Sequence, residues 1–300
     1  MSQSTNHRIG IDLGGTKIEG ILIDPGGEII RRERVPTPRE DYPLILESVD
    51  RLVSSLQVDP TIPVGIGTPG SISHISSLMR NSNSRCLNGK PLLTDLESQL
   101  SVPVRLANDA DCFTLSEATD GAAKDSRTVF GVILGTGVGG GICIDGKLID
   151  GVNGISGEWG HNPMPQMPKM TPGRACFCGN QDCIETWIAG PGLSRSYNER
   201  TGEKIDAPEI VKRQMTGETA ADDVLENYYD QLAAALSTVI NIIDPDTIVL
   251  GGGLSNVEQL YQRLPDLLAK YVFSDHIATR LVQAIHGDSS GVRGAAWLWP

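Results

Sequence analysis

The feature that most restricts the fold is a glycine-rich segment that occurs twice. Residues 10–24, GIDLGGTKIEGILID, align without gaps with residues 131–145, GVILGTGVGGGICID, and seven of the fifteen positions are identical. Apolar residues alternate on both sides of the glycines, and a further turn follows each copy, which is typical of a β-hairpin. The repeat therefore predicts two related α/β domains that each begin with a hairpin.

The length of 300 residues accommodates two such domains. We expect a small α/β domain at residues 1–120, completed by a C-terminal helix at about residues 288–300, and a large α/β domain at residues 121–287. The formal net charge of −12 argues against a nucleic-acid or anionic-membrane partner, because phosphate groups repel an acidic surface. The chain opens MSQSTNHR, without an apolar run of signal-peptide or membrane-spanning length, which predicts a cytoplasmic protein.

The two copies of the repeat differ at a position that indicates function. Asp12 in the first copy corresponds to Ile133 in the second, so a carboxylate is present at only one of two equivalent strand ends. The loop at residues 12–17 and the loop at residues 135–137 are rich in glycine, which lets backbone amides approach phosphate oxygens closely. Ordinary tight turns have the same composition, so the loops alone leave both interpretations open.

A third glycine run lies near the C-terminus. Residues 222–243 have the apolar spacing of an amphipathic helix, and residues 247–250 form a short apolar segment typical of a buried strand. Glycines 251–253 follow this strand, before a helix that we expect to start near Asn256. The carboxyl end of a strand in an α/β sheet is where ligands bind, although a tight turn before a helix would look alike.

A candidate acid–base group follows another predicted strand. Residues 103–107 are predicted to be a strand, and Asp109 begins a helical stretch, so Asn108 and Asp109 occupy a strand-to-helix junction. An ionised carboxylate there could accept the proton of a sugar hydroxyl. Asp109 could instead simply cap the helix, and Asp111 is a rival for the role of base.

Four soft metal ligands lie within a short segment: His161, Cys176, Cys178 and Cys183. Tetrahedral zinc accepts this ligand set, and Gly179 supplies a turn of the kind that such a knuckle needs. The alternative is that these thiols are small buried residues, or a disulfide with one thiol to spare. A reducing compartment favours the metal. Cys86, Cys112 and Cys143 lie far away in sequence and are expected to be ordinary buried thiols.

The order of the motifs resembles that of the sugar kinases of the ROK family, over nearly the whole chain. The motifs are DLGGTK at 12–17, ND at 108–109, LGTGVGGG at 134–141, GEWGH at 157–161, CFCGNQDCIE at 176–185 and LGGG at 250–253. The resemblance implies an actin-like, ribonuclease-H-like α/β fold, duplicated into two domains with a cleft between the lobes. It further implies a homodimer.

The resemblance also assigns roles to individual residues. Asp109 would be the catalytic base. The sugar hydroxyls would be bound by Asn83, Asn108, Glu158, His161 and Glu185. ATP and Mg²⁺ would be held by Asp12, Gly14, Gly15, Thr16, Lys17, Thr136, Gly137, Gly251, Gly252 and Gly253. A structural Zn²⁺ would be held by His161, Cys176, Cys178 and Cys183. Asp182 departs from the family pattern, which usually has glycine there, and we expect an intact knuckle because Asp tolerates a left-handed backbone better than most residues.

Within the family, the blocks at residues 81–93, 157–165 and 286–300 are most similar to bacterial fructokinases of the manno(fructo)kinase kind. This predicts an ATP-dependent hexose kinase that phosphorylates the 6-hydroxyl of fructose, with mannose as a further candidate substrate. The alternative is a kinase for N-acetylglucosamine or another hexose, because those kinases share several of the same blocks. A non-catalytic sugar-binding or regulatory protein is a more remote alternative.

Overall fold

The computed structural model describes residues 7–168 and 170–300. They divide into two compact units, of which the first comprises residues 7–124, 141–156 and 288–300 and the second comprises residues 125–140 and 157–287, apart from residue 169. The first unit thus contains most of the predicted small domain together with the segment 141–156, which the sequence-based division assigned to the large domain. In the part of the chain that the structure describes, no helix is both long and apolar enough to cross a membrane.

The first unit is built on a mixed five-stranded sheet in the order β3-β2-β1-β4-β7. Its strands are β1 (Arg8–Leu13), β2 (Lys17–Ile23), β3 (Ile29–Pro36), β4 (Val64–Thr68) and β7 (Val104–Asn108). The helices are α1 (Tyr42–Leu56), α2 (Leu92–Leu100), α3 (Asp109–Thr119) and α9 (Ser290–Trp297), with a 3₁₀ turn at Arg85–Leu87. A small ribbon pairs β5 (Ser71–Ile72) with β6 (Met79–Arg80). The hairpin β1–β2 is antiparallel, whereas β1–β4 and β4–β7 are parallel.

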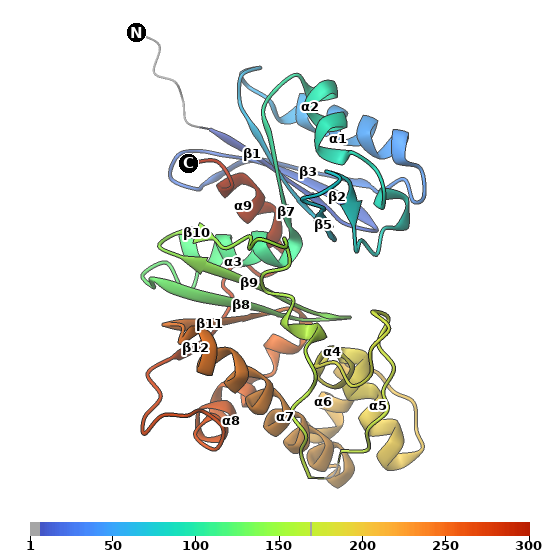
Figure 1. The fold of residues 1–300 in the computed structure, drawn as a ribbon, viewed down its shortest axis with the longest axis vertical. Coiled ribbons are helices and arrows are strands. Elements are labelled where there is room, and N and C mark those ends of the chain that lie inside the picture. Colours follow the sequence, from blue (N-terminus) through green and yellow to red (C-terminus); the bar gives the residue numbers. More distant parts are fainter. Residues whose placement is uncertain (1–6, 169) are drawn as a thin grey trace. The chain divides into compact units, whose positions relative to one another are not determined.

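The C-terminal helix α9 lies directly on the first sheet and against α3 (Figure 1). A Cβ atom on Gly10 of β1 would lie 2.2 Å from the carbonyl oxygen of Val292, and one on Gly65 of β4 would lie 1.8 Å from that of Ala295. Glycine at both strand positions therefore permits the helix to approach the sheet backbone. The apolar residues of α1 form a core with β1, β2 and β4.

The second five-stranded sheet has the order β10-β9-β8-β11-β12. Its strands are β8 (Thr128–Leu134), β9 (Val138–Ile144), β10 (Lys147–Leu148), β11 (Thr247–Gly251) and β12 (Arg280–Gln283). The chain passes from the second unit to the first within β9. Strand β11 is parallel to β8 and to β12, and β9 is antiparallel to β10. The strand order matches that of the first sheet, which confirms the predicted duplication.

Between β10 and β11 the chain forms the helices α4 (Glu185–Ile188), α5 (Gly190–Thr201), α6 (Ala207–Met215) and α7 (Thr219–Ile243), and α8 (Glu258–Leu268) lies between β11 and β12. Short 3₁₀ turns occur at Trp159–His161, Gly253–Asn256 and Gly287–Ser289. The helix predicted at 222–243 is confirmed as the longer α7, and the strand predicted at 247–250 is confirmed as β11. The helix expected near Asn256 begins two residues later, because a 3₁₀ turn occupies Gly253–Asn256.

Candidate functional site

Asp12 stands at the end of β1, beside the turn that joins β1 to β2. Within that turn, the Gly14 amide donates a hydrogen bond to the Lys17 carbonyl oxygen at 3.1 Å, and the Thr37 hydroxyl donates to the Gly14 carbonyl oxygen at 2.7 Å. The pKa of Asp12 is raised to about 6, chiefly because burial removes water and also because Asp109 and Glu19 carry like charge, with Lys17 opposing. A carboxylate that is costly to ionise alone favours a bound cation.

Asn108 and Asp109 lie at the junction of β7 and α3, as predicted. Asn108 is the N-cap, since its side-chain oxygen accepts from the Ala110 amide at 2.9 Å, and its Nδ2 donates to the Gly70 carbonyl oxygen at 3.2 Å. The Asp109 Oδ1 accepts from the same Ala110 amide at 2.8 Å, so Asp109 also binds the helix N-terminus and both interpretations of this residue stand. The Asp109 side chain is exposed, yet the protein atoms around its carboxylate displace enough water to raise its pKa, and the hydrogen bond from Ala110 opposes this.

Two further positions of the first unit bear on the predicted site. Asn83 is exposed and precedes Ser84, whose hydroxyl lies 3.6 Å from the position of a Cβ on Gly15, so the Asn83 segment passes close to the β1–β2 turn. Gly70, which the sequence analysis did not select, adopts a positive φ of 84°, and a Cβ there would lie 2.5 Å from the Arg80 carbonyl oxygen. The adjacent Pro69 and Gly70 form a turn signal that could have identified this loop.

In the second unit, His161 and the three predicted cysteines come together. Their ligand atoms all lie within 4.8 Å of one another. The His161 Nδ1 is 3.6 Å from the Cys176 Sγ, and the Sγ atoms of Cys178 and Cys183 are also 3.6 Å apart. Two thiolates on one tetrahedral zinc, with bonds of about 2.3 Å, lie about 3.8 Å apart, so the donor set fits a single ion. With Nδ1 directed at the cluster, the Nε2 edge of His161 is left for a different partner.

All six cysteines, each within the described residues, have free thiols, so the structure does not adopt the disulfide alternative. Asp182 adopts the left-handed conformation predicted for it, with φ of 54°, and Gly179 turns the chain with φ of 93°. The Asp182 carboxylate accepts hydrogen bonds from the amides of Gly173 and Arg174, which stabilise the knuckle. The prediction of ordinary buried thiols is confirmed for Cys112 and Cys143, whereas Cys86 is half-buried.

The two predicted sugar-binding glutamates of this unit have different surroundings. Glu158 is exposed and immediately precedes the Trp159–His161 turn, and the Trp159 indole donates a hydrogen bond to the Gly139 carbonyl oxygen at 3.1 Å. Glu185 is half-buried, and its Oε2 accepts a hydrogen bond from the Val138 amide at 3.0 Å. Both glutamates are therefore held next to strand β9 or the turn before it.

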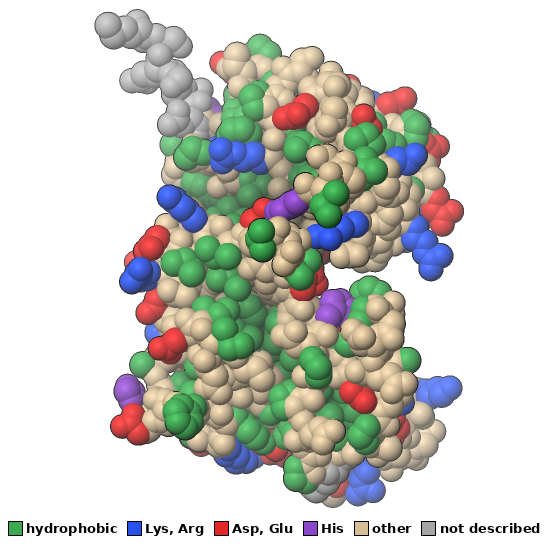
Figure 2. Space-filling model, viewed as in Figure 1, with side chains coloured by type: hydrophobic (Ala, Val, Ile, Leu, Met, Phe, Trp, Pro, Cys, Tyr) green, Lys and Arg blue, Asp and Glu red, His purple; other side chains and the backbone are tan. Residues whose placement is uncertain are grey.

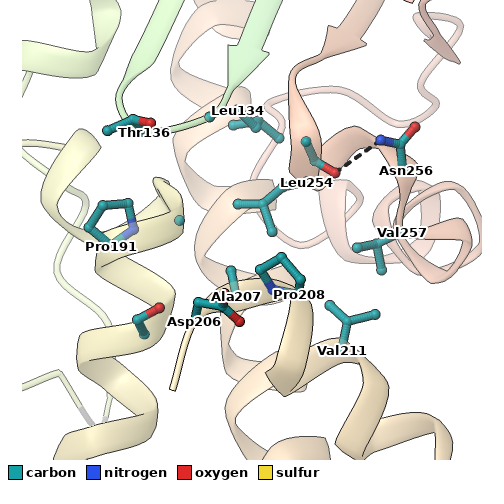
Figure 3. A pocket seen from close by; sticks show the side chains of 14 residues that line it. Leu134, Thr136, Pro191, Asp206, Ala207, Pro208, Val211, Leu254, Asn256 and Val257 are labelled. Atoms are coloured by element: carbon teal, nitrogen blue, oxygen red, sulfur yellow. Dashed lines mark hydrogen bonds between the residues drawn. The ribbon is translucent and has the colours of Figure 1, made fainter. Parts of the chain in front are cut away.

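A pocket of about 640 Å³ lies in the second unit (Figure 3). Thr136 lines it from the β8–β9 turn, and Gly253 lines it from the turn after β11, so the pocket brings together two of the three predicted glycine loops. Asn256 donates from Nδ2 to the Gly253 carbonyl oxygen at 3.2 Å, a bond drawn in Figure 3. Gly251 and Gly252 are not lining residues, and Gly252 packs closely on the Leu134 backbone.

Most of the pocket wall comes from residues that no motif had marked. They are Gly190, Pro191, Ser194, Asp206, Ala207, Pro208, Val211, Leu254, Asn256 and Val257, whereas Leu134 and Gly135 belong to the motif at 134–141. The apolar side chains among them suit a flat heterocycle, and the glycine turns at one side offer amides to phosphate. In the first unit, the carboxylates of Asp12 and Asp109 are groups of the kind that can hold a cation or accept a proton.

Lys and Arg side chains are spread over the face of the molecule shown in Figure 2 and do not form one basic patch there. Together with the net charge of −12, this gives no support to a nucleic-acid interface on that face.

Two mixed five-stranded sheets of equivalent strand order, each opened by a glycine-turn hairpin, define the duplicated α/β fold of the actin-like class. The chain belongs to the ROK family, whose model matches residues 8–300. The structure is similar to that of a ROK hexokinase from Thermus thermophilus, with a TM-score of 0.84, 28% identity and coverage of 97% of both chains. It is also similar to a ROK family glucokinase from Streptomyces griseus, solved in complex with glucose and AMPPNP, with a TM-score of 0.76, 26% identity and coverage of 97% of this chain and 98% of that one.

Among curated proteins, the chain is 39% identical to an N-acetyl-D-glucosamine kinase of Photobacterium profundum, over 96% of this chain and 98% of the relative. It is 40% identical to an N-acetyl-D-glucosamine kinase of Pectobacterium atrosepticum, over 96% of this chain and 97% of the relative. The predicted family is thus confirmed. These relatives carry the name that the sequence analysis gave as its alternative, not the name fructokinase.

Proposed function

We propose that the protein is an ATP-dependent kinase that transfers the γ-phosphoryl group of ATP to the 6-hydroxyl of N-acetyl-D-glucosamine. The observation that carries this proposal is the identity of 39–40% to proteins of that name over nearly the full length of both chains. The proposal therefore replaces fructose, the substrate favoured from sequence blocks alone, by the amino sugar. Fructose remains the second candidate substrate.

Asp109 would act as the base. As the 6-hydroxyl oxygen forms its bond to the γ-phosphorus, the bond from that phosphorus to the β,γ-bridging oxygen breaks, and the hydroxyl proton passes to the Asp109 carboxylate. ADP leaves with the bridging oxygen, and the proton is later released to solvent. The raised pKa of Asp109 supports this role, because a carboxylate that holds a proton more tightly is a stronger base.

The nucleotide would occupy the pocket of the second unit. Its apolar lining, including Pro191, Val211 and Leu254, suits the base, and the turn amides at Gly135 and Thr136 suit the phosphates. Mg²⁺ bound with ATP would reduce the charge on the phosphoryl oxygens, and Asp12 with the turn at residues 14–17 would help to hold it, as the family resemblance implies. The raised pKa of Asp12 supports this, since a nearby cation would favour its ionised form.

Sugar recognition would use Asn83 and Asn108 of the first unit and Glu158, His161 and Glu185 of the second, as the family resemblance implies. The His161–cysteine cluster would hold a structural Zn²⁺, which supplies cross-linking of the knuckle and takes no part in the chemistry. With Nδ1 of His161 directed to the metal ligands, Nε2 is the atom that could contact a hydroxyl. The family resemblance also leads us to propose a cytoplasmic homodimer.

The test is the rate of ADP release with N-acetylglucosamine, fructose, mannose, glucose and N-acetylmannosamine. We expect the largest kcat/KM with N-acetylglucosamine. A larger value with fructose would restore the second candidate, and no sugar-dependent ADP release would support the non-catalytic alternative. The Asp109→Asn variant should lower kcat by about a hundredfold or more while sugar affinity stays nearly intact. If Asp111→Asn rather than Asp109→Asn abolishes turnover, the base is Asp111.

A further inference from the structure

The carboxylate of Glu185 joins the cysteine knuckle to the β8–β9 turn. Glu185 follows Cys183 by two residues, and its Oε1 lies 4.0 Å from the Cys176 Sγ. Its Oε2 accepts a hydrogen bond from the Val138 amide at 3.0 Å. The two oxygens of one side chain thus face the metal-ligand cluster and the first residue of β9, which is buried.

A second hydrogen bond holds the other end of the same turn. The Gly190 amide donates to the Gly135 carbonyl oxygen at 2.8 Å, and within the turn the Gly135 amide donates to the Gly137 carbonyl oxygen at 3.0 Å. Glu185 and Gly190 are separated by a single helical turn, α4, which is closed by the bond from the Ala189 amide to the Glu185 carbonyl oxygen. The segment that follows the knuckle therefore holds the turn at both ends.

Gly137 shows how closely the carboxylate is fitted to the turn. A Cβ atom on Gly137 would lie 2.5 Å from the Glu185 Oε2, well inside van der Waals contact. A larger residue at position 137 would therefore displace either the turn or the carboxylate. Gly135 and Thr136, the two preceding residues, line the pocket proposed for the nucleotide.

We propose that Glu185 is a positioning residue for the nucleotide: it fixes the conformation of the turn at residues 135–138 and so sets nucleotide affinity before any sugar binds. This inference rests on the proposed function in that the pocket ligand is the phosphoryl donor. A hydrogen bond from a buried amide to a carboxylate is stronger than one between neutral groups, and losing it leaves the Val138 amide unpaired. The knuckle and the nucleotide pocket are thereby coupled through one side chain.

The experiment measures the Kd for ADP with Mg²⁺ by titration calorimetry, in the absence of sugar. Glu185→Ala should weaken binding about tenfold, the usual effect of one lost hydrogen bond to a charged group. Glu185→Gln should stay within about threefold of the natural protein, because the amide oxygen can still accept from Val138. Gly137→Ala should weaken binding as Glu185→Ala does, since the added methyl group displaces the same contact.

Glu97→Ala is the control, because it removes an exposed carboxylate of α2 that belongs to no proposed site, and it should leave the Kd for ADP unchanged. If Glu185→Ala raises the sugar KM but leaves the Kd for ADP unchanged, the positioning role is wrong and the residue serves the sugar alone. If Glu185→Ala does not fold, Glu185→Gln and Gly137→Ala still decide the matter, since equal ADP affinities in both would refute the proposal. Absence of sugar phosphorylation by the natural protein would instead refute the proposed function.

Discussion

Replacing Asp12 by Asn should make the fold more stable at neutral pH while it removes activity. Folding raises the pKa of Asp12 from 3.8 to about 6, because burial removes water around the carboxylate and Asp109 and Glu19 repel its charge. A group with a raised folded-state pKa opposes folding once it ionises. Asn fills nearly the same space without the charge, so the variant should lack this unfavourable contribution to the free energy of folding.

The sign and size of this stability difference follow from the pKa values of Asp12 in the unfolded and folded states. Below pH 3.8 the carboxyl group is protonated in both states and contributes nothing. Between pH 3.8 and about 6 the unfolded chain ionises first, so stability falls as the pH rises. Above pH 6 the full difference is present, and a gap of this size corresponds to about 3 kcal/mol. The advantage of Asp12→Asn should therefore grow from about 0.5 kcal/mol at pH 4 to as much as about 3 kcal/mol at pH 7.5.

The assay is urea unfolding of both proteins at pH 4, 5, 6 and 7.5 without added Mg²⁺, since a bound cation would stabilise the ionised carboxylate. The matched control is Asp125→Asn, at an exposed position that stays hydrated. Added Mg²⁺ should stabilise the natural protein more than the variant. A variant that is less stable than the natural protein at pH 7.5, or a stability difference that does not change with pH, would refute the reasoning.

Three other predictions concern the base, the C-terminal helix and the knuckle. The kcat/KM for the sugar should fall at acid pH with a midpoint above the ordinary Asp pKa of about 3.9, because protein atoms around the Asp109 carboxylate displace water and raise its pKa; a lower midpoint in the pH profile would argue against this base. Gly294→Ala should lower the free energy of unfolding by about 3 kcal/mol, because its methyl group would lie 1.6 Å from the Cys112 carbonyl oxygen. Gly291→Ala, in the same helix with its nearest atom at 3.7 Å, should raise it by up to about 1 kcal/mol, and equal effects of the two substitutions in urea unfolding would contradict this packing. Chelation of zinc should lower the melting temperature and raise the sugar KM, whereas full activity of metal-free protein with reduced thiols would exclude a zinc role.

Much of the fold could be predicted because its signals are local. The glycine turns and alternating strands at residues 10–24 and 131–145 predicted both hairpins, and β1–β2 and β8–β9 form there. The strand-to-helix junction at Asn108 was visible because a buried strand ends where polar residues begin a helix. The parallel pairs β1–β4 and β8–β11 join strands that are far apart in sequence. The equivalence of the two sheets could be predicted only from the repeat.

The wall of the pocket in the second unit could not be predicted from the sequence. Its wall combines Pro191 on α5, Val211 on α6 and Val257 before α8, which are ordinary apolar residues with no motif of their own. Only tertiary packing brings them together. The hydrogen bond between Glu185 and the Val138 amide could not be predicted from the sequence either, because it joins a side chain to a backbone group 47 residues away.

Substrate choice was harder to predict than reaction type for a related reason. The residues proposed to bind hydroxyls, such as Asn108 and Glu158, would contact groups that fructose, glucose and N-acetylglucosamine have in common. A site distinguishes an acetamido group by the shape and polarity of the loop that meets it. No short motif encodes that loop, so blocks shared by several sugar kinases favoured fructose while the full-length relatives are N-acetyl-D-glucosamine kinases.

The most direct test of the account identifies the product by ³¹P and ¹³C NMR after the protein is incubated with ATP, Mg²⁺ and N-acetylglucosamine. We predict N-acetylglucosamine 6-phosphate and ADP in equal amounts, formed about a hundredfold or more slowly when Asp109 is replaced by Asn. Phosphate attached at another hydroxyl, ADP formed without a sugar phosphate, or unchanged product formation by the Asp109→Asn variant would contradict the proposed reaction and its base.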